Sequence, residues 1–353
     1  MRMLITALLW CVVLPSAWAG VVCQPLVIQH SKVVADQPNY VLTVSDTDSH
    51  LATAANGGYV RNSNGNDIVF SSDSTGQTLL KWDPLESYDP ATGRLTVHVS
   101  TGPVSSTADT IIYRCAGGSA SDFQGGAAGT AWSSAYSGVY HFGDGTTLNA
   151  IDATGQHNGT VNGATAAAGQ IGGAATITGS SSISLPQGLA FPFSLEAWVK
   201  IPGATGVPQV IVTIPGTYNG GNIYLDASGY LIANYGGQCV AGPNPFPTGA
   251  WVHIGVTLAG SGGPCKLYQN GSQVASGTMI NQSQGIAGSA TLGSIGTSLP
   301  LSGLLDEVRL YSGVLSGSGI ATDYNNQSNP TAFYVPGPWS ATGRSGGTQV
   351  CIF

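Results

Sequence analysis

The sequence has 353 residues and a formal net charge of −7, and only 8 % of its residues are charged, against about 25 % in an average globular protein. Its ten Lys and Arg residues are scattered, which argues against binding to nucleic acid or to an anionic membrane surface, because both need a basic patch. The 51 Gly residues and an ordinary apolar fraction of 42 % argue against disorder and predict an all-β protein made of many short strands and turns.

Residues 1–19 have the features of a secretory signal peptide. Arg2 is followed by the apolar run MLITALLWCVVLP and then by the small residues SAWA, so we expect cleavage after Ala19. This run is too short for a good membrane span, and no later stretch has 18 consecutive apolar residues. We therefore expect an exported chain with no membrane insertion of its mature part, located outside the cell or at the cell surface, with the periplasm as an alternative.

The first predicted domain spans residues 20–130. Its strand candidates are rich in β-branched and aromatic residues and are separated by Gly, Asn, Asp and Pro turns: PLVIQ, YVLTVS, DIVFSS, TLLKWDP, RLTVHVS and TIIYRC. The turn DPATG before RLTVHV predicts a hairpin. The small-residue stretch SASDFQGGAAGTA predicts a linker to the next domain.

The second predicted domain spans residues 131–329. It alternates strands and turns without a helical period, and the Asn-Gly turn in CKLYQNGSQVASG is a strong hairpin signal. Ten or so short strands in this region predict a two-sheet antiparallel sandwich or jelly roll. Only SGSGIATDYNNQ is expected to hold a short helical turn. Residues 330–353 form a C-terminal tail that ends in TQVCIF, where we expect a last strand held by Cys351.

The cysteine pattern predicts disulfides in an exported protein. Removing Cys11 with the signal peptide leaves an odd number, five. Cys239 and Cys265 lie on successive predicted strands and are the best pair. A second bridge is expected between two of the other three, which leaves one thiol free or paired with another chain: Cys23, Cys115 and Cys351. The alternative is that all five are reduced and buried.

Four stretches of the second domain, in order, carry a resemblance to a known family: GVYHFGDGTTLNAIDATGQHNGTVNG, FSLEAWVKIPG, GAWVHIGVTLAG with CKLYQNGSQVASG, and SGLLDEVRLYSGVLS. They resemble the LamG-like jelly roll of the concanavalin A-like lectin/glucanase superfamily. The resemblance implies an antiparallel jelly-roll sandwich over nearly the whole of residues 131–329.

The first domain resembles a different family. The stretches NGNDIVFSSDSTGQTLLKWDPLESYDPATGRLTVHVS, DTIIYRCAGG and AWSSAYSGVYHF are similar to DUF2341, a bacterial domain that commonly precedes LamG-like domains. Where that family usually has an aromatic before Gly-Asn, this chain has YRCAGG, a change that supplies Cys115. The expectation for residues 20–130 is a β-sandwich-like domain.

A glucanase-type active site is not expected. Glucanases of this superfamily are similar in carrying a Glu-x-Asp-x-x-Glu pattern, with one nucleophile and one acid/base about 5 Å apart. After the signal peptide only Glu86, Glu196 and Glu307 remain, and none has the required partners. We expect Glu196 to face solvent. His141 and His253 fall inside strands and are interpreted as core or edge histidines, and no zinc spacing or Gly-x-Ser-x-Gly elbow is present.

A structural calcium ion is the best metal hypothesis. The resemblance implies an Asp of the closing strand together with oxygens of a loop near the start of the domain, which places Asp306 with Asp152 and Asn158. The alternative is an Asx-turn at Asp152 and a turn or an ion pair with Arg309 at Asp306. Because strand residues alternate, Asp306 and Glu307 are expected on opposite faces, one toward a metal or loop and the other toward solvent or Arg309.

Carbohydrate binding is the use that the resemblance implies. Sugars need aromatic platforms and amide or hydroxyl groups on loops, and four residues fit, with ordinary loop packing as the alternative for each: Tyr218, Asn219, Tyr235 and Phe246. Trp198 and Trp251 are assigned to the core. Trp132 and Tyr136 are expected to pack between the two domains.

These patterns predict an exported, non-catalytic protein that recognises a glycan or a surface protein, or mediates adhesion. The alternative is a structural, self-assembling subunit of an extracellular fibre or coat, consistent with low charge and an odd cysteine. A polysaccharide-active enzyme is the residual alternative, and fold analogy alone is a weak guide to function.

Overall fold

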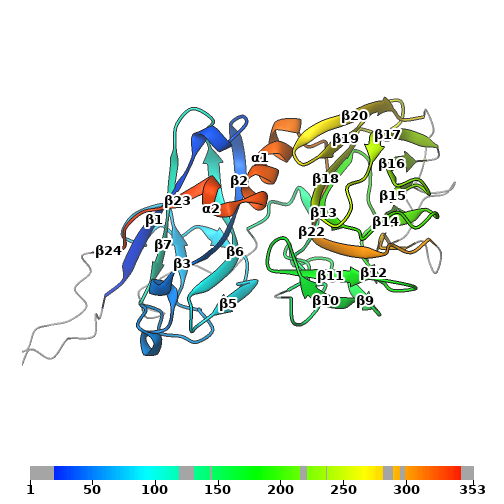
Figure 1. Ribbon diagram of the computed structural model, residues 1–353. Coiled ribbons are helices and arrows are strands. Elements are labelled where there is room, and N and C mark those ends of the chain that lie inside the picture. Colours follow the sequence, from blue (N-terminus) through cyan, green and yellow to red (C-terminus); the bar gives the residue numbers. More distant parts are fainter. Residues whose placement is uncertain are drawn as a thin grey trace, which may run out of the picture.

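The computed structural model describes residues 20–118, 131–143, 145–214, 221–235, 237–280, 289–294 and 299–342. It consists of two β units that lie side by side, with two short helices at their junction (Figure 1). The proposed signal peptide, most of the linker and Cys351 lie outside the described residues. None of the described helices is long and apolar enough to cross a membrane.

The first unit is a sandwich of two antiparallel sheets. One sheet has the order β23-β1-β7-β3 with β24 also on β1, and the other has the order β2-β6-β4 with β5 also on β6. The bounds are β1 (Val22–Ile28), β2 (Gln37–Thr47), β3 (Val69–Ser71), β4 (Lys81–Trp82), β5 (Ser87–Asp89), β6 (Arg94–Val104), β7 (Thr110–Ala116), β23 (Tyr334–Pro336) and β24 (Ser340–Ala341). Three 3-10 turns cover His30–Lys32, Ser49–Leu51 and Ala54–Asn56. Alternating side chains of both sheets form one buried apolar core.

The second unit is a larger two-sheet sandwich. Its sheet orders are β10-β11-β22-β13-β18-β19-β20, with β8 also on β22, and β17-β16-β15-β14-β21-β12-β9. The first sheet contains β8 (Tyr136–Tyr140), β10 (Thr165–Ala168), β11 (Gly173–Ile177), β13 (Phe193–Lys200), β18 (Val252–Leu258), β19 (Pro264–Gln269), β20 (Ser272–Thr278) and β22 (Gly303–Tyr311). The second contains β9 (Thr160–Asn162), β12 (Ser182–Ser184), β14 (Gln209–Ile214), β15 (Gly221–Leu225), β16 (Tyr230–Tyr235), β17 (Gln238–Pro245) and β21 (Thr291–Leu292).

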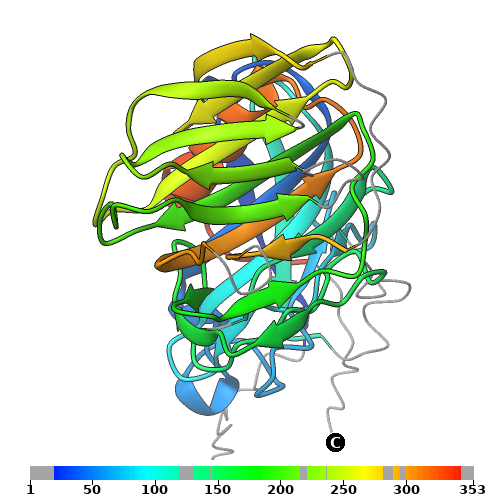
Figure 2. The same ribbon diagram turned by 90° about the vertical axis from the view of Figure 1, so that its right-hand side faces the viewer.

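The second sheet of this unit lies on the far side from the first unit, and Figure 2 shows its strands running side by side across the molecule. The predicted all-β fold with an antiparallel jelly-roll sandwich is confirmed. The Asn-Gly hairpin is also confirmed, because Asn270 and Gly271 have positive φ angles of 47° and 75° between β19 and β20.

The chain returns to the first unit after the jelly roll. The expected helical turn is a 12-residue helix, α1 (Gly317–Ser328), whose N-cap Ser316 accepts a hydrogen bond from Gly319 N. It is followed by α2 (Pro330–Phe333) and by β23 and β24, which both pair with β1. Part of the predicted tail is therefore an edge of the first sandwich, and Phe333 and Tyr334 are buried in its core.

Helix α1 covers a polar face of the jelly roll. Trp198 Nε1 in β13 donates a hydrogen bond to Gln327 Oε1 at 2.6 Å. The preceding residue, Asn326, bonds to the backbone of Thr43 in β2 of the first unit. The outer face of the eight-stranded sheet is thus covered by α1 and the first unit, which is why polar and charged side chains on that face are buried.

Two disulfides are present among the described residues. Cys239–Cys265 forms as predicted, and the second bridge is Cys23–Cys115, between neighbouring positions of β1 and β7. Cys11 and Cys351 lie outside the described residues, and the prediction that one thiol is free or pairs with another chain stays a prediction.

Candidate functional site

A β-bulge in β22 explains why two acids stand side by side in a chain with few charges. Trp198 of β13 pairs with Asp306 and Glu196 pairs with Arg309, so β22 holds one residue more than its partner between these pairs. Glu307 has φ 49°, a left-handed conformation rarely adopted by a residue of this kind. The bulge breaks the alternation on which the prediction of opposite faces rested.

Both acids of the bulge are buried, so of the two alternatives for the second acid, solvent or Arg309, the structure has Arg309. Asp306 and Glu307 are 0 % and 1 % exposed. Asp306 Oδ2 accepts a hydrogen bond from Ile171 N at 2.9 Å, and Glu307 Oε2 accepts one from Arg309 Nη2 at 2.7 Å. The expected loop contact and the expected pairing with Arg309 are both present, one for each acid.

Glu307 belongs to a cluster of four side chains from both units. Glu86 and His98 come from the first unit, and His141 and Glu307 come from the second, with one nitrogen or oxygen of each within 4.8 Å of the others. Glu307 Oε1 lies 2.5 Å from His141 Nδ1 and 3.3 Å from His98 Nε2. Glu86 Oε2 lies 3.4 Å from His98 Nε2. We call these four residues the interface cluster.

The two imidazoles of the interface cluster stack face to face. The ring centroids of His98 and His141 are 3.9 Å apart and their planes differ by 7°. His98 Nδ1 is 3.2 Å from Thr43 Oγ1, and His141 Nε2 is 3.4 Å from Asp83 Oδ2. Asp83 also accepts a hydrogen bond from Trp132 Nε1 at 2.5 Å, which places Trp132 between the units as expected.

The electrostatics divide the acids in and beside the interface cluster into two groups. Burial disfavours the charged form of Glu307, but His141, His98 and Arg309 hold its pKa well below the usual range. Burial raises the pKa of Glu86, and burial together with the neighbouring Glu307 raises the pKa of Asp306. Burial would lower the pKa of His141, yet Glu307 and Asp83 raise it to about 10.

A second buried polar group lies beside the cluster, on β13, β18 and α1. Glu196 is 0 % exposed, so the expectation that it faces solvent is wrong, because α1 and the first unit cover this face. Burial and then the nearby Asp323 raise its pKa well above the usual range. His253 Nε2 is 3.5 Å from Glu196 Oε1, and burial followed by repulsion from Arg309 lowers the pKa of His253 to about 3.

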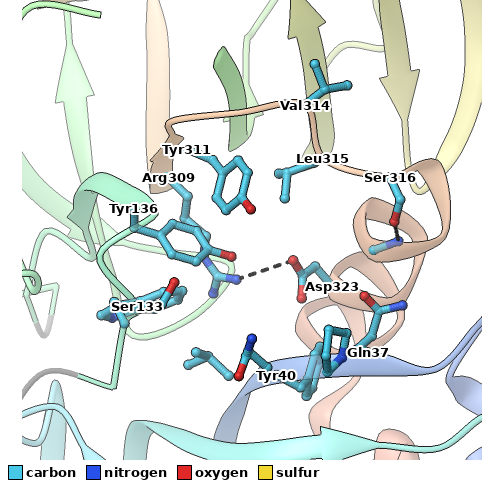
Figure 3. A pocket seen from close by; sticks show the side chains of 15 residues that line it. Gln37, Tyr40, Ser133, Tyr136, Arg309, Tyr311, Val314, Leu315, Ser316 and Asp323 are labelled. Atoms are coloured by element: carbon cyan, nitrogen blue, oxygen red, sulfur yellow. Dashed lines mark hydrogen bonds and ion pairs between the residues drawn. The ribbon is translucent and has the colours of Figure 1, made fainter. Parts of the chain in front are cut away.

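A pocket of about 200 Å³ opens next to these groups, between β2, β8, β22 and α1. Figure 3 shows Tyr136 and Tyr311 along one side and the Arg309–Asp323 pair across the pocket. The two phenol rings meet edge to face, with centroids 5.2 Å apart. The residues that line the pocket are Gln37, Pro38, Asn39, Tyr40, Val41, Trp132, Ser133, Tyr136, Arg309, Tyr311, Val314, Leu315, Ser316, Gly319 and Asp323.

Arg309 joins the pocket to the interface cluster. It is 2 % exposed, and its guanidinium carbon lies 4.7 Å from the centre of the Trp132 ring. Nη2 is bonded to Glu307, while Nη1 lies 4.0 Å from Asp323 Oδ2. Among the described residues, Arg309 Nε has no hydrogen-bond partner. A buried donor of this kind is a ready contact for an oxygen of a ligand.

The residues near the start of the domain that were proposed to bind calcium make hydrogen bonds within the protein. The Asp152 carboxylate accepts hydrogen bonds from the backbone of Val139, Thr154, Gln156 and His157 and from the Thr154 hydroxyl. Asn158 Oδ1 accepts a hydrogen bond from Asp152 N at 3.0 Å. These contacts form the Asx-turn that was the alternative, and no contact between Asp152 and Asp306 is seen within the described ranges. Calcium binding stays a prediction.

The predicted sugar-binding residues have different positions. Tyr218 and Asn219 lie outside the described residues, and only the backbone of Tyr235, in β16, is described. Phe246 is 3 % exposed and packs in the jelly-roll core, which leaves no ring face for a sugar. Trp198 is buried as predicted, whereas Trp251 is only partly buried and is absent from the core.

Comparison with known proteins concerns the second unit. The sequence model of the protein family described as the concanavalin A-like lectin/glucanases superfamily matches residues 172–321. This match supports the predicted LamG-like jelly roll, while the resemblance of residues 20–130 to DUF2341 stays a prediction. A search of curated proteins found no match.

Solved structures of related shape each cover about half of this chain. Domain 4 of AbnA, a GH43 extracellular arabinanase from Geobacillus stearothermophilus in complex with arabinotriose, has 29 % identity and a TM-score of 0.45 over 54 % of this chain and 98 % of that one. The binding domain of Paraclostridial Mosquitocidal Protein 1 has 17 % identity and a TM-score of 0.46 over 55 % and 52 %. A Trypanosoma rangeli sialidase has 17 % identity and a TM-score of 0.44 over 56 % and 33 %.

Sequence reasoning missed both the interface cluster and the pocket. One available signal was His98, a polar residue within the apolar strand RLTVHVS, and another was the expected position of Trp132 and Tyr136 between the domains. Nothing local in the sequence indicates that His98 meets His141, because the two lie in different units and the contact depends on how the units dock.

Proposed function

We propose that this chain is an exported, non-catalytic binding protein that recognises a glycan or another hydroxyl-rich surface ligand. The pocket between the two units carries the proposal. It combines aromatic rings with hydroxyl, amide, guanidinium and carboxyl groups, the side chains with which proteins hold sugars. The superfamily match of residues 172–321 supports the same reading.

The charges of the pocket favour a neutral ligand. Arg309 and Asp323 face each other across it, so an anionic or cationic ligand would meet a like charge on one side. A sugar hydroxyl can accept from the guanidinium and donate to the carboxylate. At about 200 Å³ the pocket is below the roughly 300–1,000 Å³ of sites for drug-sized ligands, so we expect one sugar ring or a chain end.

A glycan array tests the proposal, with the chain probed once in calcium and once in EDTA. We expect specific binding that falls at least about tenfold in Tyr311→Ala, equivalent to about 1.4 kcal/mol. Tyr224→Ala is the matched control, since Tyr224 is a partly exposed tyrosine of β15, on the far sheet. Binding that survives Tyr311→Ala would move the site elsewhere, with Tyr218, Asn219 and Tyr235 next, and no binding at all would contradict the proposal. Loss in EDTA would favour the calcium hypothesis.

Self-assembly is the competing function. It predicts higher-order species that dissociate on reduction, through the cysteine left over from the two bridges. Sedimentation velocity with and without reductant separates the two proposals, because a glycan-binding monomer keeps its size in both conditions.

The buried carboxyls beside the pocket give the enzyme alternative a specific form. Asp323 lines the pocket, burial raises its pKa, and Glu196 lies next to it. A carboxyl group with a raised pKa beside a sugar site is what the general acid of glycoside hydrolysis needs. This alternative predicts that the wild-type protein releases reducing ends from the bound glycan and that Asp323→Asn does not. That result would identify catalysis, and not binding alone, as the function.

A further inference from the structure

We propose that the interface cluster is a site for a zinc-class transition-metal dication that joins the two units. Glu86, His98, His141 and Glu307 supply two imidazole nitrogens and two carboxylates, a ligand set that suits zinc. Glu86 and His98 come from the first unit and His141 and Glu307 from the second, so the site forms only when the units dock.

The distances around His98 agree better with a shared ion than with hydrogen bonds. His98 Nε2 lies 3.4 Å from Glu86 and 3.3 Å from Glu307, and a single N–H cannot donate fully to both. Charge-assisted hydrogen bonds are shorter, about 2.7–2.9 Å. The edge of a tetrahedron around zinc with bonds of about 2.0–2.1 Å is about 3.3 Å long, which matches both separations.

Both histidines have the outer contacts that metal-bound histidines need. Assigning Nδ1 of His98 as the donor to Thr43 Oγ1 leaves the Nε2 lone pair facing Glu86 and Glu307. The Nε2 of His141 lies 3.4 Å from Asp83, while its Nδ1 lies 2.5 Å from Glu307 Oε1, so the proton of this hydrogen bond must leave when a metal binds. Each ring is thus oriented through the nitrogen that does not face the cluster.

Buried carboxyl groups outnumber the cationic groups around the interface cluster. Glu86, Glu307, Asp83 and Asp306 have side chains that are buried or nearly so, and within the described residues Arg309 and His141, whose pKa is raised, are the cations that contact them. Within the described part of the chain, Asp306 Oδ1 has no hydrogen-bond partner. Buried carboxylates are costly unless a cation or a proton compensates them, and a dication would compensate two at once.

The stack of imidazoles sets one condition for metal binding. Parallel rings 3.9 Å apart cannot both direct an in-plane lone pair at one ion, so one ring must turn when the metal binds. His141 is the ring expected to turn, because its side chain is 11 % exposed while that of His98 is fully buried. His98 Nε2 already lies within 3.4 Å of a carboxylate oxygen of both Glu86 and Glu307, and His141 completes the set.

Histidine also distinguishes this site from the calcium hypothesis. Calcium takes oxygen ligands, six to eight of them, whereas two of the four groups here are nitrogens. A competition between the two ions therefore tests the class of metal.

The experiment uses the full chain, secreted in its processed form without a polyhistidine tag, stripped with EDTA and equilibrated with zinc chloride. We expect one zinc per chain by mass spectrometry of the metal, a rise of several degrees in Tm, and no displacement by excess calcium. Cobalt in place of zinc should give the intense visible absorption bands of a tetrahedral site.

Matched variants locate the ion. His98→Gln and Glu86→Gln should each reduce bound zinc to near zero. His253→Gln and Glu196→Gln are the controls, since they remove the same residue types from the buried face nearby but outside the cluster. Where a cluster variant does not fold, as judged by circular dichroism, the wild-type stoichiometry and cobalt spectrum decide. Zinc far below one per chain, full zinc retention in both cluster variants, a cobalt spectrum without tetrahedral bands, or displacement by calcium would each overturn the proposal.

Discussion

Asn326 of α1 bonds to both backbone groups of Thr43 in β2. Thr43 N donates to Asn326 Oδ1 at 2.7 Å, and Asn326 Nδ2 donates to Thr43 O at 3.0 Å. β2 is an edge strand of its sheet, so a side chain of the jelly-roll helix occupies the place of a missing neighbouring strand. Because both bonds are buried, they fix the register between the two units and so hold the interface cluster and the pocket together.

Asn326→Ala should weaken this docking. The substitution leaves a buried N–H and a buried C=O of Thr43 unpaired. Each unpaired group costs about 1–3 kcal/mol. We expect the free energy of unfolding, measured in urea, to fall by at least that amount. Asn325→Ala is the control, since Asn325 makes a single exposed bond to Lys32 O and should change stability by less than about 1 kcal/mol. Equal effects of the two substitutions would contradict this role for Asn326.

Arg114→Met should be among the most destabilising single changes in the first unit. Arg114 is fully buried, and its guanidinium donates to Gln24, Asp46 and Asp48 at 2.6, 2.6 and 3.0 Å. Removing the cation leaves two acids facing each other without compensation, at a cost of about 3–5 kcal/mol.

The control for Arg114 is Arg94→Met, because Arg94 is exposed at the start of β6. We expect its substitution to change the unfolding free energy by less than about 1 kcal/mol. If Arg114→Met lowers the unfolding free energy no more than Arg94→Met does, Asp46 and Asp48 are well solvated without the arginine.

The same network predicts a dependence of stability on pH. Burial alone would raise the pKa of Asp48, but hydrogen bonds from Trp339 and His50 and the charge of Arg114 lower it from 3.8 to about 2. A carboxylate whose pKa is lowered in the folded state stabilises the fold at pH values above its unfolded pKa, near 3.8. This contribution is lost as the pH falls toward 2.

Asp48→Asn separates this contribution from other acids. We expect the wild type to exceed the variant by about 2 kcal/mol at pH 6 and the difference to shrink between pH 4 and pH 2, measured by urea unfolding at each pH. A difference that stays constant over this range would mean that Asp48 stabilises the fold through its shape and not through its charge.

The fold followed from the sequence because strand patterns are local. Alternation and turn residues located most strands, and the Asn270–Gly271 turn formed as expected. The return of β23 and β24 to β1 was not predicted, because their pairing joins residues more than 300 positions apart. α1 was underestimated since its Gly and Ser residues are weak helix formers, and its stability comes from docking on both units.

Much less of the candidate site could be predicted from the sequence. Glu196 was expected in solvent because a polar residue on a strand usually marks an exposed face. Here that face is covered by a helix and a second unit, so the rule fails where the interface begins. The bulge at Glu307 was also invisible, since no Gly or Asn marks its positive φ. Glu196 and Glu307, which break these local rules, lie where the two units meet, which is where we place both the pocket and the metal site.

Removal of the disulfides should cost different amounts in the two units. The entropy of loop closure predicts about 3.5 kcal/mol for Cys239–Cys265 and about 4.6 kcal/mol for Cys23–Cys115, because the bridges enclose 26 and 92 residues. The paired variants Cys239→Ser with Cys265→Ser and Cys23→Ser with Cys115→Ser test this order by urea unfolding in the absence of reductant. If removal of Cys239–Cys265 lowers the unfolding free energy more than removal of Cys23–Cys115, the bridges stabilise chiefly through contacts in the folded state. In that case reduction of the wild-type protein before unfolding should lower its unfolding free energy by similar amounts.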